Sequence, residues 1–144
     1  MANVLELSQI RLGGTATDRD GAIAEAAAIL TEAGAVTPEY LDYMLQRENT
    51  VSTYMGNLLA IPHGTNEGKD TILASALSFV RYNEPIDWGG EEVRFVVGIA
   101  GKENGHLEIL TKIAIVFSEE DEVAKLVAAS TPEEVLDLLG DIND

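Results

Sequence analysis

The chain has 144 residues, 46% of them apolar and 24% charged, which predicts a single domain over residues 1–144. Acids outnumber bases 25 to 9, so the net charge of −16 repels nucleic acid and anionic membrane surfaces. The chain has no cysteine, which excludes thiol catalysis, disulfides and thiolate metal sites. It also lacks a signal-peptide pattern and an apolar run long enough to span a membrane, so we expect a cytoplasmic protein without direct membrane insertion.

Helix and strand patterns alternate along the chain, beginning with an extended segment over residues 4–12. The next segment predicts a helix with Thr17 as N-cap and Gly34 just past its end, because a hydroxyl accepts from the first N–H groups and glycine adopts left-handed angles easily. A second helix is expected to open at the pair Thr37-Pro38 and to end over residues 47–49.

The middle of the chain predicts the strands of a sheet. The apolar run over residues 58–61 indicates a buried strand, and the alternation over residues 72–80 indicates another. Residues 82–90 contain a proline and two adjacent glycines, so we expect a loop there. Residues 93–100 are β-branched and apolar and give the strongest strand signal.

Three helices are expected after the last strand. The first runs from residue 104 or 105 to residue 117, and Ser118 is predicted to cap the second, over residues 119–129. The third opens at a capping box over residues 131–134 and continues through residue 139. This alternation of strands and helices predicts an α/β layer structure.

Two histidines and one arginine are the candidates for chemistry. His63 follows a buried strand and so lies at its carboxyl end, where ligand sites collect in α/β sheets; the alternative is a turn histidine that hydrogen-bonds a carbonyl. His106 falls in the first turn of a helix, where N–H groups attract anions, or it has no role there. Arg47 can bind phosphate with its forked guanidinium, or it can complement a helix C-terminus.

The motifs of metal and nucleotide sites do not occur in the sequence. The two histidines are 43 residues apart, with no cysteine and no HExxH pattern, so no metal site is expected. Glycine-rich nucleotide-binding loops are absent as well, and no cofactor is expected.

Three segments resemble one protein family. Residues 52–65 (STYMGNLLAIPHGT) are similar to the active-histidine segment of the mannitol/fructose-type enzyme IIA proteins of the bacterial sugar phosphotransferase system. Residues 43–48 (YMLQRE) resemble the arginine segment of that family, and residues 98–110 resemble its second-histidine segment. The likeness runs from about residue 3 to residue 140, in the order of the family.

The resemblance implies roles for three residues. His63 matches the phosphorylated histidine, which carries phosphate on Nε2 in the family, and His106 matches the second active-site histidine. Arg47 matches the arginine that helps to hold the phosphate. The fold implied by the resemblance is a mixed, largely parallel sheet flanked by helices.

The resemblance also implies two protein partners. The phosphocarrier protein HPr would donate the phosphoryl group, and a cysteine of the IIB domain of a mannitol permease would accept it, without metal or cofactor. The pair Gly64-Thr65 is more similar to the mannitol branch than to the fructose or nitrogen-regulatory branches, whereas Asn57 stands where some mannitol members carry an acid.

Two other functions remain open at this stage. The chain could be a regulatory phospho-accepting module of the same fold, of the nitrogen type, that passes phosphate to nothing. It could also be a relative in fold only, without phosphate chemistry.

Overall fold

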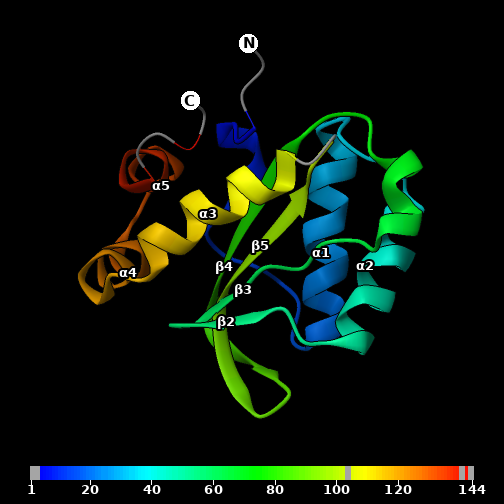
Figure 1. Ribbon diagram of the computed structural model, residues 1–144. Coiled ribbons are helices and arrows are strands. Elements are labelled where there is room, and N and C mark those ends of the chain that lie inside the picture. The colour runs from blue at the N-terminus through cyan, green and yellow to red at the C-terminus, as the bar shows by residue number, and fades with distance from the viewer. Residues whose placement is uncertain (1–3, 103–104, 140–141, 143–144) are drawn as a thin grey trace.

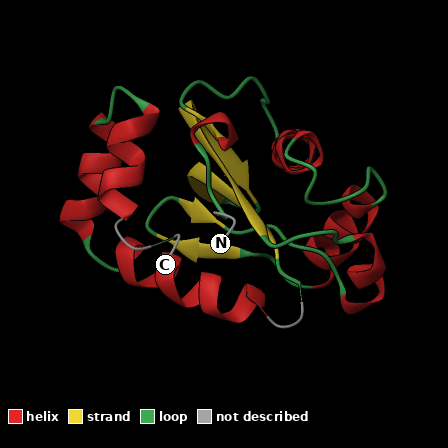
Figure 2. Ribbon diagram, turned by 90° about the horizontal axis from the view of Figure 1, so that it is seen from above, coloured by secondary structure: helices red, strands yellow, loops and turns green. Residues whose placement is uncertain are grey.

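A five-stranded mixed sheet forms the centre of the molecule, with helices on both sides (Figures 1 and 2). This is seen in a computed structural model that describes residues 4–102, 105–139 and 142, without the side chains of residues 66 and 105–107. In spatial order the strands are β1 (Ile10–Arg11), β4 (Ala76–Trp88), β5 (Glu91–Ala100), β3 (Leu59–Ala60) and β2 (Tyr54–Gly56).

The strand directions place the carboxyl end of β1 and the carboxyl end of β3 at opposite ends of the sheet. β1 runs parallel to β4, and β3 runs parallel to β5, while β4 and β5 form an antiparallel hairpin and β2 pairs antiparallel with β3. The predicted α/β fold with a mixed sheet between helices is confirmed, with two parallel and two antiparallel strand pairs where the family resemblance implies a largely parallel sheet.

One face of the sheet is covered by α1 (Arg19–Glu32) and α2 (Tyr40–Thr50), which bury Val80 and Val96 against them. The opposite face carries α3 (Gly105–Phe117), α4 (Glu120–Ala128) and α5 (Pro132–Leu139). Successive strand residues point to opposite faces, so Phe79 and Val97 pack into this second core. Both faces of the central strands are thus buried, which explains their nearly continuous apolar sequence.

The loop predicted over residues 82–90 is wrong, because β4 continues through this segment to Trp88. The pairing of β4 with β5 is irregular between Arg81 and Ile86, and Pro85 lies inside this interruption, where its missing N–H breaks no regular ladder bond. Gly89 and Gly90, with φ of 65° and 97°, form the two-residue turn of the hairpin.

Helix ends follow the predicted chemistry with shifted residues. Asp18, rather than Thr17, caps α1 and accepts from the Gly21 N–H at 2.7 Å. Ser118 does not cap α4; its hydroxyl donates back to the Ile115 carbonyl. Of the capping box predicted for the last helix, the Thr131 cap is confirmed, since its hydroxyl accepts from the Glu134 N–H at 3.2 Å, whereas the Glu134 carboxylate accepts from the Ser130 hydroxyl at 2.7 Å.

Other elements begin or end a few residues away from the predicted positions. Within the segment predicted as extended over residues 4–12, η1 (Leu7–Gln9) forms a 3-10 turn, and only β1 pairs as a strand. α2 begins later and ends later than predicted. A second 3-10 helix, η2 (Asn66–Thr71), links the end of β3 to β4. In the part of the chain that is described, no helix is long and apolar enough to cross a membrane.

Candidate active site

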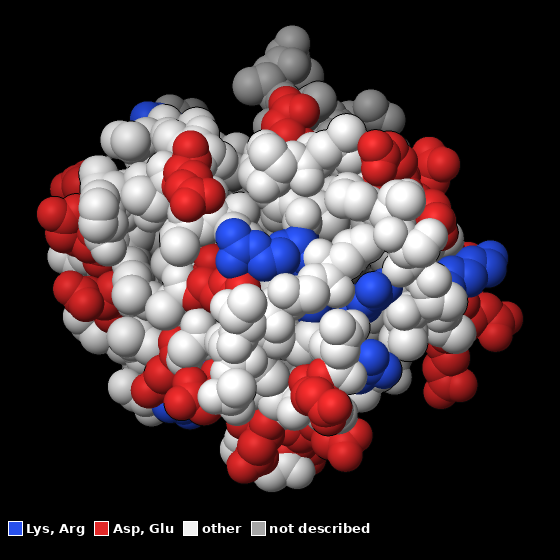
Figure 3. Space-filling model, turned by 180° about the vertical axis from the view of Figure 1, so that it is seen from behind, with Lys and Arg blue, Asp and Glu red and all other residues white. Residues whose placement is uncertain are grey.

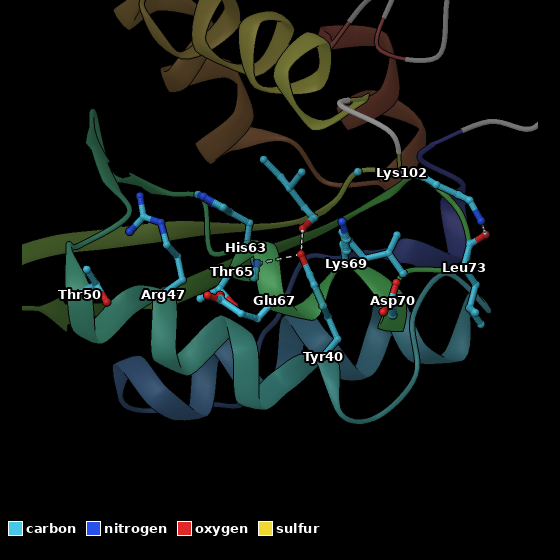
Figure 4. A pocket seen from close by; sticks show the side chains of 14 residues that line it. Tyr40, Arg47, Thr50, His63, Thr65, Glu67, Lys69, Asp70, Leu73 and Lys102 are labelled. Atoms are coloured by element: carbon cyan, nitrogen blue, oxygen red, sulfur yellow. Dashed lines mark hydrogen bonds between the residues drawn. The ribbon is translucent and has the colours of Figure 1, made fainter.

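A cleft of about 930 Å³ opens at the edge of the sheet where β3 and β5 end (Figure 4). Its walls come from α2, from the segment after β3, from η2 and from the loop after β5. The lining side chains that bear on its chemistry are Tyr40, Arg47, Thr50, His63, Thr65, Glu67, Lys69, Asp70, Leu73 and Lys102.

His63 lies in this cleft at the carboxyl end of β3, as the sequence predicts. The Ile99 N–H donates to the Pro62 carbonyl at 3.0 Å, and His63 forms an isolated parallel bridge with Ile99, so pairing with β5 resumes beyond β3 itself. The residue is half-buried on a backbone that the sheet holds. The backbone therefore holds the ring in place, while part of the residue stays accessible from the cleft.

The imidazole of His63 is oriented by its own turn. Its Nδ1 lies 2.8 Å from the Ile61 carbonyl oxygen. Because a carbonyl oxygen can only accept, Nδ1 carries the hydrogen, and in the neutral ring the lone pair is on Nε2. The hydrogen bond to a carbonyl that the alternative interpretation of His63 predicts is thus present. This bond also selects the tautomer that makes Nε2 the nucleophilic nitrogen.

Tyr40 fixes the backbone on the far side of His63. Its buried hydroxyl accepts from the Gly64 N–H at 2.8 Å and donates to the Ile99 carbonyl at 2.8 Å (Figure 4). A Cβ on Gly64 would come within 2.5 Å of the Tyr40 ring, so the residue after His63 must be glycine for this approach. Burial raises the pKa of Tyr40 to about 12, which keeps the hydroxyl protonated as a donor.

Arg47 extends from the last turn of α2 and lines the same cleft as His63, where Figure 4 shows the two side chains next to each other. Its Nη1 donates to the Val51 carbonyl at 2.6 Å, which fixes the guanidinium at the end of the helix. Its place in the last turn also suits the helix dipole, so the two interpretations of Arg47 are compatible.

Positive charge gathers at the cleft of a strongly acidic chain. Three of the nine basic residues, Arg47, Lys69 and Lys102, line it, together with the acids Glu67 and Asp70. On the face drawn in Figure 3, acidic side chains are spread around the outline, while basic ones lie both near the middle and at the margin. The two lysines are not among the site residues predicted from the sequence, although Lys102 follows the strongest strand and so lies at its carboxyl end.

His106 lies in the first turn of α3, the helix that follows β5. Its side chain is outside the described residues, so its role as the second active-site histidine stays a prediction. Among the residues that are described, no group of three or more His, Asp or Glu side chains is placed to hold a metal ion.

Asn57 has a position unlike that of an active-site acid. It lies in the turn between β2 and β3 with a φ of 51°, and its amide nitrogen donates to the Phe117 carbonyl at 2.6 Å. An ionised carboxylate cannot donate this bond. The side chain therefore ties the end of α3 to the sheet.

The fold and the cleft define an open-sheet α/β protein suited to handling an anionic group at a histidine. Residues 3–141 match the family described as "Phosphoenolpyruvate-dependent sugar phosphotransferase system, EIIA 2". The chain belongs to this family, and the predicted resemblance is confirmed.

Similar proteins cover almost the whole chain. A mannitol-specific phosphotransferase enzyme IIA component from Halalkalibacterium halodurans is 46% identical over 141 residues, 98% of this chain and 97% of the relative. The crystal structure of IIA mannitol from Escherichia coli has 36% identity and a TM-score of 0.88, covering 94% of this chain and 99% of that one. A complex of enzyme IIA-Mtl with phosphorylated enzyme IIB-Mtl from Escherichia coli matches at 35% identity and a TM-score of 0.89, covering 95% and 97%.

Proposed function

We propose that this chain is the IIA component of a mannitol phosphotransferase system and carries a phosphoryl group on Nε2 of His63. The hydrogen bond between Nδ1 and the Ile61 carbonyl carries the proposal, because it leaves the neutral ring with its lone pair on Nε2, at a cleft lined by cations. The mannitol-specific names of the relatives, and the solved complex of one of them with a phosphorylated IIB, support the assignment.

The first chemical step is attack by Nε2 on the phosphorus of phospho-HPr. A bond forms between phosphorus and Nε2 of His63, and the bond from phosphorus to the donor imidazole breaks, so the electron pair returns to HPr. His63 becomes positively charged during this step, and the Ile61 carbonyl stabilises that charge through the Nδ1 hydrogen, 2.8 Å from nitrogen to oxygen. Neutral imidazole needs no separate base for the attack.

The second step passes the group to a cysteine thiolate of IIB. The sulfur attacks phosphorus, the bond to Nε2 breaks, and His63 regains its lone pair. In both steps Arg47 and the N–H groups at the start of α3, where His106 lies, stabilise the equatorial phosphoryl oxygens, and Lys69 and Lys102 add positive charge.

Net charge assists the encounter with HPr. The family resemblance implies that HPr presents a positive rim around its histidine, and a chain of charge −16 attracts such a surface from a distance. We place this exchange in the cytoplasm, where both partners would meet the chain in turn.

Labelling with phospho-HPr tests the proposal. We expect one phosphohistidine signal in phosphorus NMR, its loss in His63→Ala, its retention in His106→Ala at a lower rate, and transfer to the cysteine of a mannitol IIB domain. Labelling that survives in His63→Ala would overturn the assignment of the site. A labelled His63 that transfers to no member of a panel of IIB domains would instead indicate a regulatory module.

A further inference from the structure

Glu48 is a buried acid in α2, one residue after Arg47 and only 3% exposed. Its carboxylate accepts from the Thr53 N–H at 2.7 Å, from the Thr53 hydroxyl at 2.5 Å and from Trp88 Nε1 at 3.2 Å. Thr53 and Trp88 are equally buried, at 4% and 2%. A carboxylate this deep is costly unless donors satisfy it, and the two bonds from Thr53 hold that residue firmly to the helix.

A chain of hydrogen bonds leads from this carboxylate to the imidazole of His63. The Thr53 carbonyl accepts from the Ile61 N–H at 3.1 Å. The Ile61 carbonyl in turn accepts from Nδ1 of His63 at 2.8 Å. The bond that selects the tautomer of His63 therefore depends on where Thr53 places Ile61.

The same short segment also holds Arg47. Nη1 of Arg47 donates to the Val51 carbonyl at 2.6 Å, and the Val51 N–H donates to the Arg47 carbonyl at 3.3 Å. Val51 is two residues before Thr53, so residues 51–53 bond the Arg47 side chain directly and reach the His63 ring through Ile61. Glu48 fixes this segment from the buried side.

We propose that Glu48 is a positioning residue that sets the place of Arg47 and His63 together, through residues 51–53. It does not contact the phosphoryl group, because its buried carboxylate already accepts hydrogen bonds from Thr53 and Trp88. The rate effect of this inference rests on the proposed function, whereas its effect on the His63 ring does not.

The chain offers a matched control for this idea. Glu48→Gln keeps the volume of the side chain but removes its charge, so the charge-assisted bonds to Thr53 become weaker neutral ones, and the bond at the Thr53 hydroxyl must reverse because an amide NH2 only donates. Trp88→Phe removes the third donor to the same carboxylate, from the β4–β5 hairpin, and leaves the bonds to Thr53 in place. Both variants weaken the buried hydrogen bonds made by the side chain at position 48, but only the first loosens residues 51–53.

The experiment compares wild type, Glu48→Gln and Trp88→Phe by nitrogen-15 NMR of the His63 ring and by the rate of labelling from phospho-HPr, at a temperature where all are folded. In Glu48→Gln we expect the ring to become a mixture of tautomers and the rate to fall roughly tenfold, as for a small misplacement of reacting groups. In Trp88→Phe we expect both to match wild type despite its lower melting temperature.

Two results would overturn the inference: wild-type tautomer and rate in Glu48→Gln, or equal slowing in Trp88→Phe. If Glu48→Gln does not fold, Thr53→Val replaces it, since it removes the 2.5 Å hydroxyl bond and keeps the backbone bonds; a shift in the same direction is expected, and no shift contradicts the idea. Failure of wild type to accept phosphate from HPr would overturn the proposed function alone, because the tautomer comparison needs no phosphate.

Discussion

At the carboxyl end of β1, the buried carboxylate of Glu25 accepts from Arg11 Nη1 and the Tyr82 hydroxyl, both at 2.6 Å, and from the backbone N–H groups of Thr15 and Ala16. At the carboxyl end of β3, on the opposite edge of the sheet, the cations around His63 line an open cleft. Charged groups gather at both edges. At the end of β1 they pair with one another inside the molecule, whereas at the end of β3 they line the open cleft.

The difference separates charge that is paired within the fold from charge that lines an open cleft, where the proposed function places the phosphoryl group. A buried acid with several donors is held in one geometry and is costly to disturb. Burial raises the pKa of Glu25, but hydrogen bonds from Tyr82, Arg11, Thr15 and Ala16 outweigh it, so the pKa lies below its ordinary value. Arg47 instead donates one N–H to Val51 and lines the open cleft, where its other N–H groups would bind phosphoryl oxygens in the proposed function.

Removing Glu25 should have the largest effect on stability. Glu25→Ala leaves the Tyr82 hydroxyl and two backbone N–H groups without their acceptor, so we expect a loss of about 3–4 kcal/mol in the free energy of unfolding, measured with urea. The rate of labelling at His63 should not change while the protein is folded. A slower rate in folded Glu25→Ala would show that the two edges are coupled.

Removing Arg47 should have the converse effect. Arg47→Ala is expected to slow labelling by roughly 10², or about 2.7 kcal/mol in the transition state, because a donor to the phosphoryl oxygens is lost. The free energy of unfolding should change by less than about 1 kcal/mol, since the side chain is only half-buried. Arg47→Lys keeps the charge without the fork and should recover part of the rate; an unchanged rate in Arg47→Ala would remove the residue from the site.

The sequence predicted the location of His63 because local signals sufficed. An apolar run followed by proline, histidine and glycine marks a buried strand and its exit turn, and the structure places His63 at that end, bridged to Ile99. The second half of β4 could not be predicted in the same way. Proline and the adjacent glycines indicate a loop locally, whereas pairing with β5 decides the structure there.

Sequence patterns could not predict the polar contacts between residues that lie far apart in the chain. Glu25 meets Tyr82 57 residues away, and Glu48 meets Trp88 40 residues away. In the sequence both acids look like ordinary helix-surface residues, since periodicity gives no partner for a single acid. The cleft lysines were missed for a related reason, because only the fold brings η2 and the loop after β5 together with α2.

Acid should remove the stabilisation that Glu25 contributes to the fold. Because the pKa of Glu25 is lower in the folded protein than its ordinary value of 4.5, its stabilisation is complete above that value and is lost as the pH falls through the lower folded pKa. Urea unfolding from pH 7 to pH 3 should show stability falling below about pH 4.5. Glu25→Gln should flatten this fall; an identical slope in wild type and variant would contradict the assignment.

The smallest expected effect belongs to Lys69, whose side chain lies along the cleft in Figure 4. Lys69→Met should slow labelling about twofold, or by about 0.5 kcal/mol, because an exposed ammonium group in water stabilises a nearby anion only weakly. Lys125→Met is the matched control: it makes the same change in net charge, but Lys125 lies outside this cleft and pairs with Glu122 at 3.2 Å. Equal slowing in both variants would attribute the effect to the overall charge of the molecule, and slowing confined to Lys69→Met would attribute it to the cleft.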